Sequence, residues 1–126
     1  MYVSLHEHLR RNNVDDDLRH LFVAIATGSK YVHHALQTGD LGLAGTSNMY
    51  GEDQLALDVL SNKLFIKELQ ESCQTSVLAS EELDDVLETP TKQKGRFAVA
   101  FDPLDGSSLV DANLAIGSIF GIYEGD

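Results

Sequence analysis

Two pairs of carboxylates in this chain stand where they could bind a metal ion. Each pair directly follows a strand-length apolar run: Glu81 and Glu82 follow residues 76–80, and Asp102 and Asp105 follow residues 97–101. Such runs predict buried strands, and open α/β sheets bind ligands at the carboxyl ends of their strands. If the two strands are neighbours, four carboxylates converge, and protons or divalent cations must relieve their repulsion.

The second pair belongs to the segment Asp-Pro-Leu-Asp-Gly-Ser-Ser, residues 102–108. Pro103 has no amide hydrogen, so we expect sheet pairing to end there and the chain to turn. The step Gly106, Ser107 and Ser108 could begin a helix whose free amides bind an anion. Carboxylates beside an anion cradle suggest a magnesium and phosphate site. The residues alone leave open the alternative that these are two unrelated acidic turns.

Size and composition narrow the class of protein. The chain has 126 residues, of which 43% are hydrophobic, and it carries a net charge of −11. This length fits one domain, residues 1–126. The acidic balance argues against nucleic-acid binding, which needs a basic face. No apolar run is long enough to span a membrane, and the single cysteine, Cys73, cannot form an internal disulfide. We therefore expect a soluble, cytoplasmic protein.

Periodicity predicts the elements that position the carboxylates. After a weakly ordered start over residues 1–13, a helix should run from Asp15–Asp17, which would cap it, to Gly39-Asp40. A glycine-rich loop should follow, then a second helix over about 53–72, then strands over 76–80, 97–101 and 116–123. This order predicts a layered α/β fold with the helices packed on a sheet.

The second helix carries one carboxylate of interest, Asp58. Its apolar stripe is expected at these positions: Leu55, Val59, Ile66 and Leu69, widened by Leu57, Leu60 and Leu64. Asp58 lies near the edge of that stripe, where a carboxylate costs free energy unless it is paired, hydrated or bound to a ligand.

Five segments, in order, closely resemble the fructose-1,6-bisphosphatase family of metal-dependent sugar phosphatases. They are Ala-Gly-Thr-Ser-Asn at 44–48, Leu-Asp-Val-Leu-Ser-Asn at 57–62, Ser-Glu-Glu at 80–82, Phe-Asp-Pro-Leu-Asp-Gly-Ser-Ser at 101–108 and Gly-Ser-Ile-Phe-Gly-Ile-Tyr at 117–123. The resemblance runs collinearly from about Leu18 to Tyr123. It implies a mixed sheet in a sugar-phosphatase-like fold, and only the front half of that fold, because family members are well over twice as long.

The resemblance also implies a role for each matched residue. Glu81, Asp102 and Asp105 would ligate Mg²⁺, or Mn²⁺ in its place, through their carboxylates, and Leu104 through its backbone carbonyl. Glu82 and Asp58 would orient or deprotonate the attacking water. The reacting phosphate would be held by Asp105, Gly106, Ser107 and Ser108. Glu52 stands where the family has an acidic residue on a catalytic loop, usually an aspartate.

The activity implied is hydrolysis of the 1-phosphate of a sugar bisphosphate, with fructose 1,6-bisphosphate as the first substrate. Leu109 and the terminal Gly-Asp are similar to sedoheptulose bisphosphatases, so sedoheptulose 1,7-bisphosphate is the alternative. An inositol-phosphatase-like activity and a non-catalytic metal- or phosphate-binding fragment are further alternatives. The family places the chain in carbohydrate metabolism, in gluconeogenesis or the Calvin cycle, and implies a homo-oligomer, a dimer or tetramer. Arg96-Phe97 stands where AMP-regulated members have Lys-Tyr, so AMP control is not expected.

Overall fold

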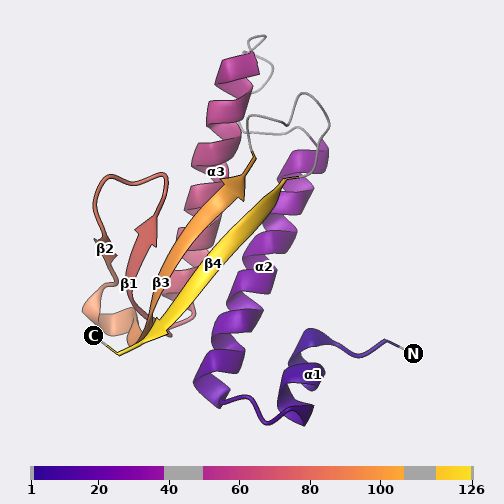
Figure 1. Cartoon of the computed structure of the whole chain (residues 1–126), viewed down its shortest axis with the longest axis vertical. Helices are drawn as coiled ribbons and strands as arrows, with labels where there is room; N and C mark the ends of the chain where they lie inside the picture. The colour runs from indigo at the N-terminus through magenta and orange to yellow at the C-terminus, as the bar shows by residue number, and fades with distance from the viewer. Residues whose placement is uncertain (1, 39–49, 107–115, 126) are drawn as a thin grey trace.

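The structure is a computed structural model that describes residues 2–38, 50–106 and 116–125, with only the backbone for residues 50–55. The other residues are drawn as a thin grey trace in Figure 1. The predicted glycine-rich loop and the predicted helix start at Ser107 and Ser108 lie outside the described residues.

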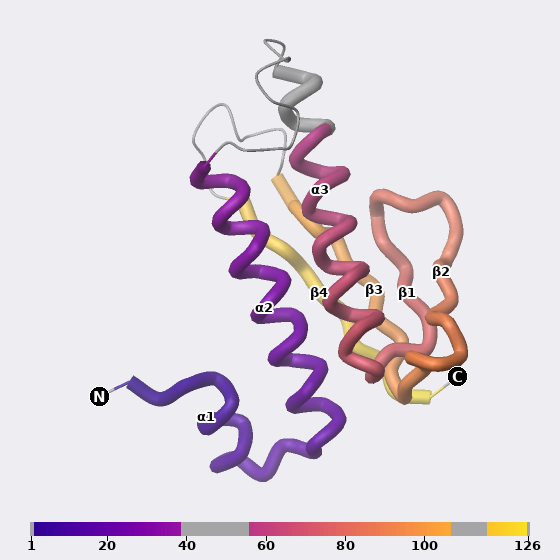
Figure 2. Tube along the Cα trace, turned by 180° about the vertical axis from the view of Figure 1, so that it is seen from behind, coloured from indigo at the N-terminus to yellow at the C-terminus, as the bar shows by residue number. Residues whose placement is uncertain are grey.

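Three helices and one four-stranded sheet make up the described fold. The elements are α1 Leu5–Arg11, α2 Asp16–Thr38, α3 Tyr50–Glu71, β1 Thr75–Ser80, β2 Leu87–Glu88, the 3-10 helix η1 Thr91–Gln93, β3 Lys94–Asp105 and β4 Gly117–Glu124. The strand order is β2-β1-β3-β4; β1 and β3 run parallel, and the other pairs are antiparallel. Helices α2 and α3 lie against one face of this sheet (Figures 1 and 2). The predicted layered α/β fold with a mixed sheet is confirmed.

The expectation of a weakly ordered N-terminus is wrong, because residues 5–11 form helix α1. Ser4 caps this helix, its hydroxyl accepting a hydrogen bond from the Glu7 amide at 3.1 Å. Glu7 in turn forms ion pairs with Arg10 and Arg11. The hydrogen bonds from these two arginines to the Glu7 carboxylate lower the pKa of Glu7 to about 2. Leu9 is buried, which docks this short polar helix on the rest of the fold.

The predicted cap of α2 is confirmed, and a second role for its aspartates was missed. The Asp15 carboxylate accepts a hydrogen bond from the Leu18 amide at 3.3 Å, which lowers the pKa of Asp15. Arg96 on β3 forms ion pairs with Asp15 and Asp17 at 2.7 and 3.3 Å, and with Glu124 on β4 at 2.8 Å. The first turn of α2 is therefore fastened to the end of the sheet.

The predicted apolar stripe of α3 is only partly correct. Val59, placed on the stripe, is 43% exposed. The buried line runs instead through Leu57, Ser61, Phe65 and Leu69, four residues apart. Sequence periodicity missed this line because a serine interrupts it. Asp58 lies beside it and is half-buried, as its position near an apolar edge predicted.

The prediction that sheet pairing ends at Asp102-Pro103 is also wrong. Strand β3 continues to Asp105, with Asp102 opposite Ile119 and Asp105 opposite Gly117 on β4. The register shifts between these two pairs, and such a bulge tolerates a proline because the ladder is already interrupted there. On the other side of β3, β1 ends at Ser80, opposite Phe101, so Pro103 faces no partner strand there.

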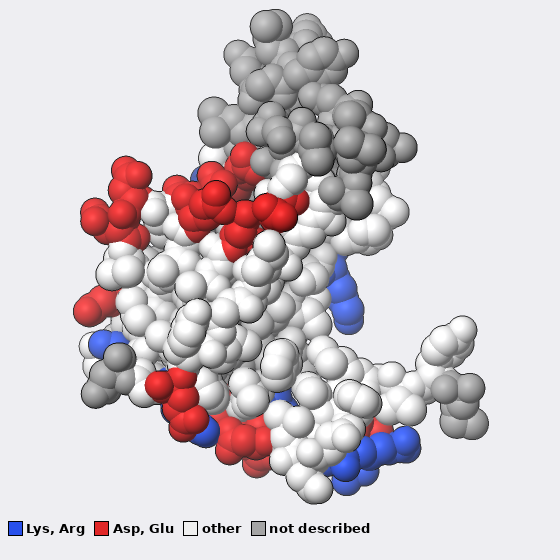
Figure 3. All heavy atoms as spheres, in the orientation of Figure 1, with Lys and Arg blue, Asp and Glu red and all other residues white. Residues whose placement is uncertain are grey.

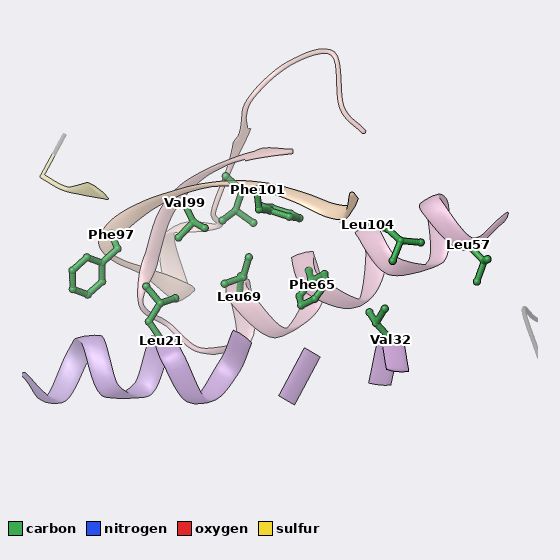
Figure 4. Close-up of a cluster of buried hydrophobic side chains, with 10 residues drawn as sticks. Leu21, Val32, Leu57, Phe65, Leu69, Phe97, Val99, Phe101 and Leu104 are labelled. Carbon is green, nitrogen blue, oxygen red and sulfur yellow. The ribbon is translucent and has the colours of Figure 1, made fainter. Parts of the chain in front are cut away.

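The core lies between the sheet and helices α2 and α3 (Figure 4). Phe65 on α3 is fully buried, and its ring meets Phe101 on β3 and Phe120 on β4 edge-on, with centroids 6.2 and 4.9 Å away. Phe101 and Phe120 stack on each other at 5.6 Å. Leu104 is also part of this core. The segment that carries Asp102 and Asp105 is thus anchored to the core by Phe101 on one side and Leu104 on the other.

Candidate active site

The carboxyl ends of β1 and β3 meet at one edge of the sheet, which is the arrangement that the sequence left conditional on the two strands being neighbours. The two strands run parallel with Ser80 opposite Phe101, and the Glu81 amide donates a hydrogen bond to the Phe101 carbonyl at 3.0 Å. Glu81 and Asp102 therefore leave the sheet side by side. Acidic side chains gather on this part of the surface (Figure 3). A hollow of about 530 Å³ opens beside them, lined by Glu81, Asp102 and the aromatic side chains of β4.

Glu81 and Asp102 are in direct contact. Their carboxyl groups share a hydrogen bond, and this bond raises the pKa of Glu81, with further contributions from the charge of Asp102, burial, Glu82 and Asp105. The ionised form of Glu81 is therefore disfavoured by the carboxylates around it. This end of the sheet therefore has an excess of negative charge that a proton or a cation must balance.

Glu82, the residue after Glu81, is also affected by neighbouring carboxylates. Burial raises the pKa of Glu82, and the charges of Asp58 and Asp102 raise it further. Helix α3 thus brings Asp58 close enough to act on Glu82, although the two residues are 24 positions apart in the sequence. The charges of Glu82, Asp102 and Asp105 act on Glu81, and those of Asp58 and Asp102 act on Glu82, so the five predicted carboxylates in these elements are linked electrostatically.

The irregular end of β3 after Asp102 is held partly by the Asp102 side chain. Asp102 Oδ1 accepts a hydrogen bond from the Leu104 amide at 3.2 Å, and the Ser118 hydroxyl on β4 donates to the Pro103 carbonyl at 2.8 Å. Gly106 follows with a φ of +82°, which a residue with a Cβ atom rarely adopts. The predicted site residues Leu104 and Asp105 therefore lie at the end of β3 and Gly106 in the turn that follows, whereas Ser107 and Ser108 lie outside the described residues.

Glu52 is placed differently from the expectation. The resemblance put it on a loop, but its backbone lies within the first turn of α3. Its side chain is outside the description, so its predicted part in catalysis stays a prediction.

The donor set at the sheet edge fits a hard divalent cation by its chemistry. All five acidic groups offer carboxylate oxygens, the ligands that Mg²⁺ prefers, and a cation would relieve the repulsion among them. Among the side chains that the structure describes, no three His, Cys, Asp or Glu residues are yet close enough together to hold a metal ion. The site thus provides one pair of carboxyls in contact and three more within electrostatic reach.

The raised pKa of Glu81 gives an expected pH dependence for the metal-free chain. A carboxyl whose pKa is higher in the folded state than its usual value of 4.5 binds its proton more tightly when folded. Its contribution to stability is fully present below the usual pKa and is lost as pH rises through the raised one. Urea unfolding at a series of pH values should therefore show this loss in the wild type. Asp102→Asn should reduce it, because Asp102 is its main cause; equal pH dependence in both proteins would contradict the arrangement.

Sequence reasoning missed two buried polar residues next to these carboxylates. Asn62 on α3 and Ser80 on β1 are each 7% exposed and hydrogen-bonded to each other. Both fall within segments that resemble the family, but nothing in the local pattern shows that they meet.

Comparison with known proteins agrees with this geometry. Residues 2–126 match the family model described as fructose-1-6-bisphosphatase, N-terminal domain. A class 1 fructose-1,6-bisphosphatase of Pelobacter propionicus is 55% identical over 123 residues, and one of Geobacter sulfurreducens is 54% identical. A cytosolic fructose-1,6-bisphosphatase of Oryza sativa is 44% identical. The crystal structure of Leishmania major fructose-1,6-bisphosphatase in holo form superimposes with a TM-score of 0.82 at 30% identity, over 98% of this chain.

The chain spans only part of these relatives. The match covers 98% of this chain but 38% of the Pelobacter protein and 38% of the Leishmania chain. None of the helices in the described part of the chain is long and apolar enough to cross a membrane. Because residues 2–126 match the family model and the fold is shared with a family member, the chain belongs to the fructose-1,6-bisphosphatase family, in which it corresponds to the N-terminal domain.

Proposed function

We propose that this chain is the metal- and phosphate-binding part of a Mg²⁺-dependent sugar-bisphosphate 1-phosphatase, which hydrolyses fructose 1,6-bisphosphate to fructose 6-phosphate and phosphate. The observation that carries the proposal is the contact between the Glu81 and Asp102 carboxyls at the meeting point of β1 and β3. The names of the relatives supply the substrate and its place in carbohydrate metabolism.

In this proposal the carboxylates of Glu81, Asp102 and Asp105 and the backbone carbonyl of Leu104 would hold Mg²⁺, with Mn²⁺ as a substitute. When bound, the metal would lower the pKa of a water molecule and neutralise charge on the phosphate. Glu81 and Asp102 would hold the cation as carboxylates, since metal ligands must be deprotonated.

The other acidic pair would handle the attacking water. Burial raises the affinity of Glu82 for a proton, and the negative charges of Asp58 and Asp102 raise it further. Glu82 is thus suited to take a proton from water as the water attacks the 1-phosphate. Asp105 and Gly106, with Ser107 and Ser108, would hold that phosphate. Because water itself would be the nucleophile, no covalent enzyme intermediate would form.

The experiment that tests the proposal is phosphate release by the purified chain. Fructose 1,6-bisphosphate and sedoheptulose 1,7-bisphosphate are supplied separately, with Mg²⁺ and then with Mg²⁺ chelated. We expect release from fructose 1,6-bisphosphate that stops on chelation. Faster phosphate release from sedoheptulose 1,7-bisphosphate would show that the seven-carbon sugar is the preferred substrate. Phosphate release that is unaffected by chelation would contradict the metal requirement.

A second candidate function is a metal- or phosphate-binding fragment without turnover. It is favoured by the 38% coverage of the relatives, because residues that contact the rest of the substrate would then belong to the part of the relatives outside the match. Mg²⁺ binding by a folded chain that releases no phosphate would support it. The proposal also includes a cytosolic location, which the rice relative's name states for that protein. It further includes a homo-oligomeric state.

A further inference from the structure

A short hydrogen bond links helix α3 to the end of strand β1. The Ser80 hydroxyl donates to the Asn62 side-chain oxygen at 2.5 Å, across 18 positions of sequence. Both residues are more than nine-tenths buried. A buried hydroxyl and a buried amide need partners, because an unsatisfied polar group in the interior is costly. This requirement explains why Asn62 and Ser80 form a hydrogen bond with each other. It does not explain why the Ser80 hydroxyl also binds a backbone amide.

The same hydroxyl also holds the turn that carries the acidic side chains. Ser80 Oγ accepts a hydrogen bond from the Glu82 amide at 3.2 Å, and the Ser80 carbonyl accepts one from the Leu83 amide at 3.0 Å. Ser80 thus fixes the backbone on both sides of Glu82. At the other end of this link, Asn62 lies one helical turn after Asp58, and residues four apart on a helix share a face.

From this chain of contacts we propose that Asn62 and Ser80 are positioning residues, which hold the Glu81–Glu82 turn against α3 so that Glu82 faces Asp58. The inference deepens the proposed function and rests on it. Neither residue is assigned contact with metal or substrate. Their effect is to fix the backbone from which the acidic side chains extend, as hydrogen-bonded supporting residues do around metal sites.

The chain offers a matched control at the opposite end of β1. The hydroxyls of Thr75 and Thr89 are also buried and lie 3.1 Å apart, and Thr75 also donates to the Leu69 carbonyl at 3.3 Å. Thr89→Val removes a buried hydrogen bond of the same kind while keeping the shape of the side chain. Because Thr89 pairs with the opposite end of β1 from Glu82, this variant shows the effect of a general loss of stability that leaves the Glu81–Glu82 turn unchanged.

The test compares four variants of the full chain with the wild type. Ser80→Ala removes the link, Ser80→Cys keeps most of the side-chain volume with a far weaker hydrogen-bond donor, Ser80→Thr keeps the hydroxyl, and Thr89→Val is the control. Two quantities are measured at a temperature where each variant is folded: hydrogen exchange of the Glu82 amide by NMR, and the Mg²⁺ dissociation constant by calorimetry.

Ser80→Ala and Ser80→Cys should speed exchange of the Glu82 amide and weaken Mg²⁺ binding about 10- to 100-fold, the range for residues that support metal ligands. Ser80→Thr and Thr89→Val should stay close to the wild type in both measurements. Unchanged exchange in the alanine and cysteine variants overturns the inference, whether or not the chain binds Mg²⁺. Faster exchange with unchanged Mg²⁺ affinity also overturns it and leaves the proposed function intact. A wild type that binds no Mg²⁺ contradicts the proposed function, and the exchange data alone then decide whether Ser80 holds the turn.

Discussion

Asp102→Asn is expected to weaken Mg²⁺ binding at least about 100-fold, beyond the usual effect of residues that only support ligands, and to abolish Mg²⁺-dependent phosphate release. Asparagine has nearly the same shape but no charge, and Asp102 is the group whose carboxyl touches Glu81. The substitution also removes a negative charge from a crowded cluster, so the metal-free variant should fold and be no less stable than the wild type.

Calorimetric titration with Mg²⁺ measures the loss of Mg²⁺ affinity, and urea unfolding measures the stability of the metal-free variant. Asp85→Asn is the matched control, because it makes the same change of charge at an exposed position of the segment after β1. It should bind Mg²⁺ like the wild type. An Mg²⁺ affinity of Asp102→Asn equal to that of Asp85→Asn would contradict the assignment of Asp102 as a ligand.

Phe65→Ala is expected to lower the free energy of unfolding by about 3–5 kcal/mol, as for other large buried side chains. The Phe65 ring is fully buried and meets the rings of both Phe101 and Phe120, so its loss leaves a cavity that the stacked pair cannot fill without moving. Since domains of this kind have about 5–15 kcal/mol in all, this single change removes a large fraction of the total.

Urea unfolding of Phe65→Ala and of Tyr31→Ala tests this expectation. Tyr31 is an aromatic residue on α2 that is 52% exposed, and truncation of an exposed residue usually changes stability by about 0.5 kcal/mol or less. A loss for Phe65→Ala no larger than that for Tyr31→Ala would show that α3 does not pack on the sheet through this ring.

Those parts of the fold that rest on local pattern were predictable. Helix α2 has a long apolar face with aspartates before it, and its predicted limits agree with the structure to within about a residue. Helix α1 was missed because its stability comes from the Ser4 cap and the ion pairs of Glu7, which an apolar pattern does not register. Strand β3 was ended too early because whether Pro103 breaks a ladder depends on which strands lie beside it.

The candidate site was predictable up to the step that needs tertiary structure. The position of Glu81 and Asp102 at two strand ends can be deduced from the sequence, but only the parallel pairing of β1 with β3 shows that these two ends lie side by side. Periodicity marked Asp58 as a carboxylate near an apolar edge, and only the family resemblance gave it a role at the site. The contact between Asn62 and Ser80 had no sequence signal, since both are common polar residues in different elements.

The central claim is that the carboxyl ends of β1 and β3 bind Mg²⁺ through Glu81 and Asp102. The most direct test is a Mg²⁺ titration of the full chain in which NMR follows the side-chain carboxyl carbons. We expect saturable shifts at Glu81 and Asp102 and no saturable shift at Asp84 or Asp85. Shifts confined to Asp84 and Asp85, or none at any carboxyl, would contradict the account.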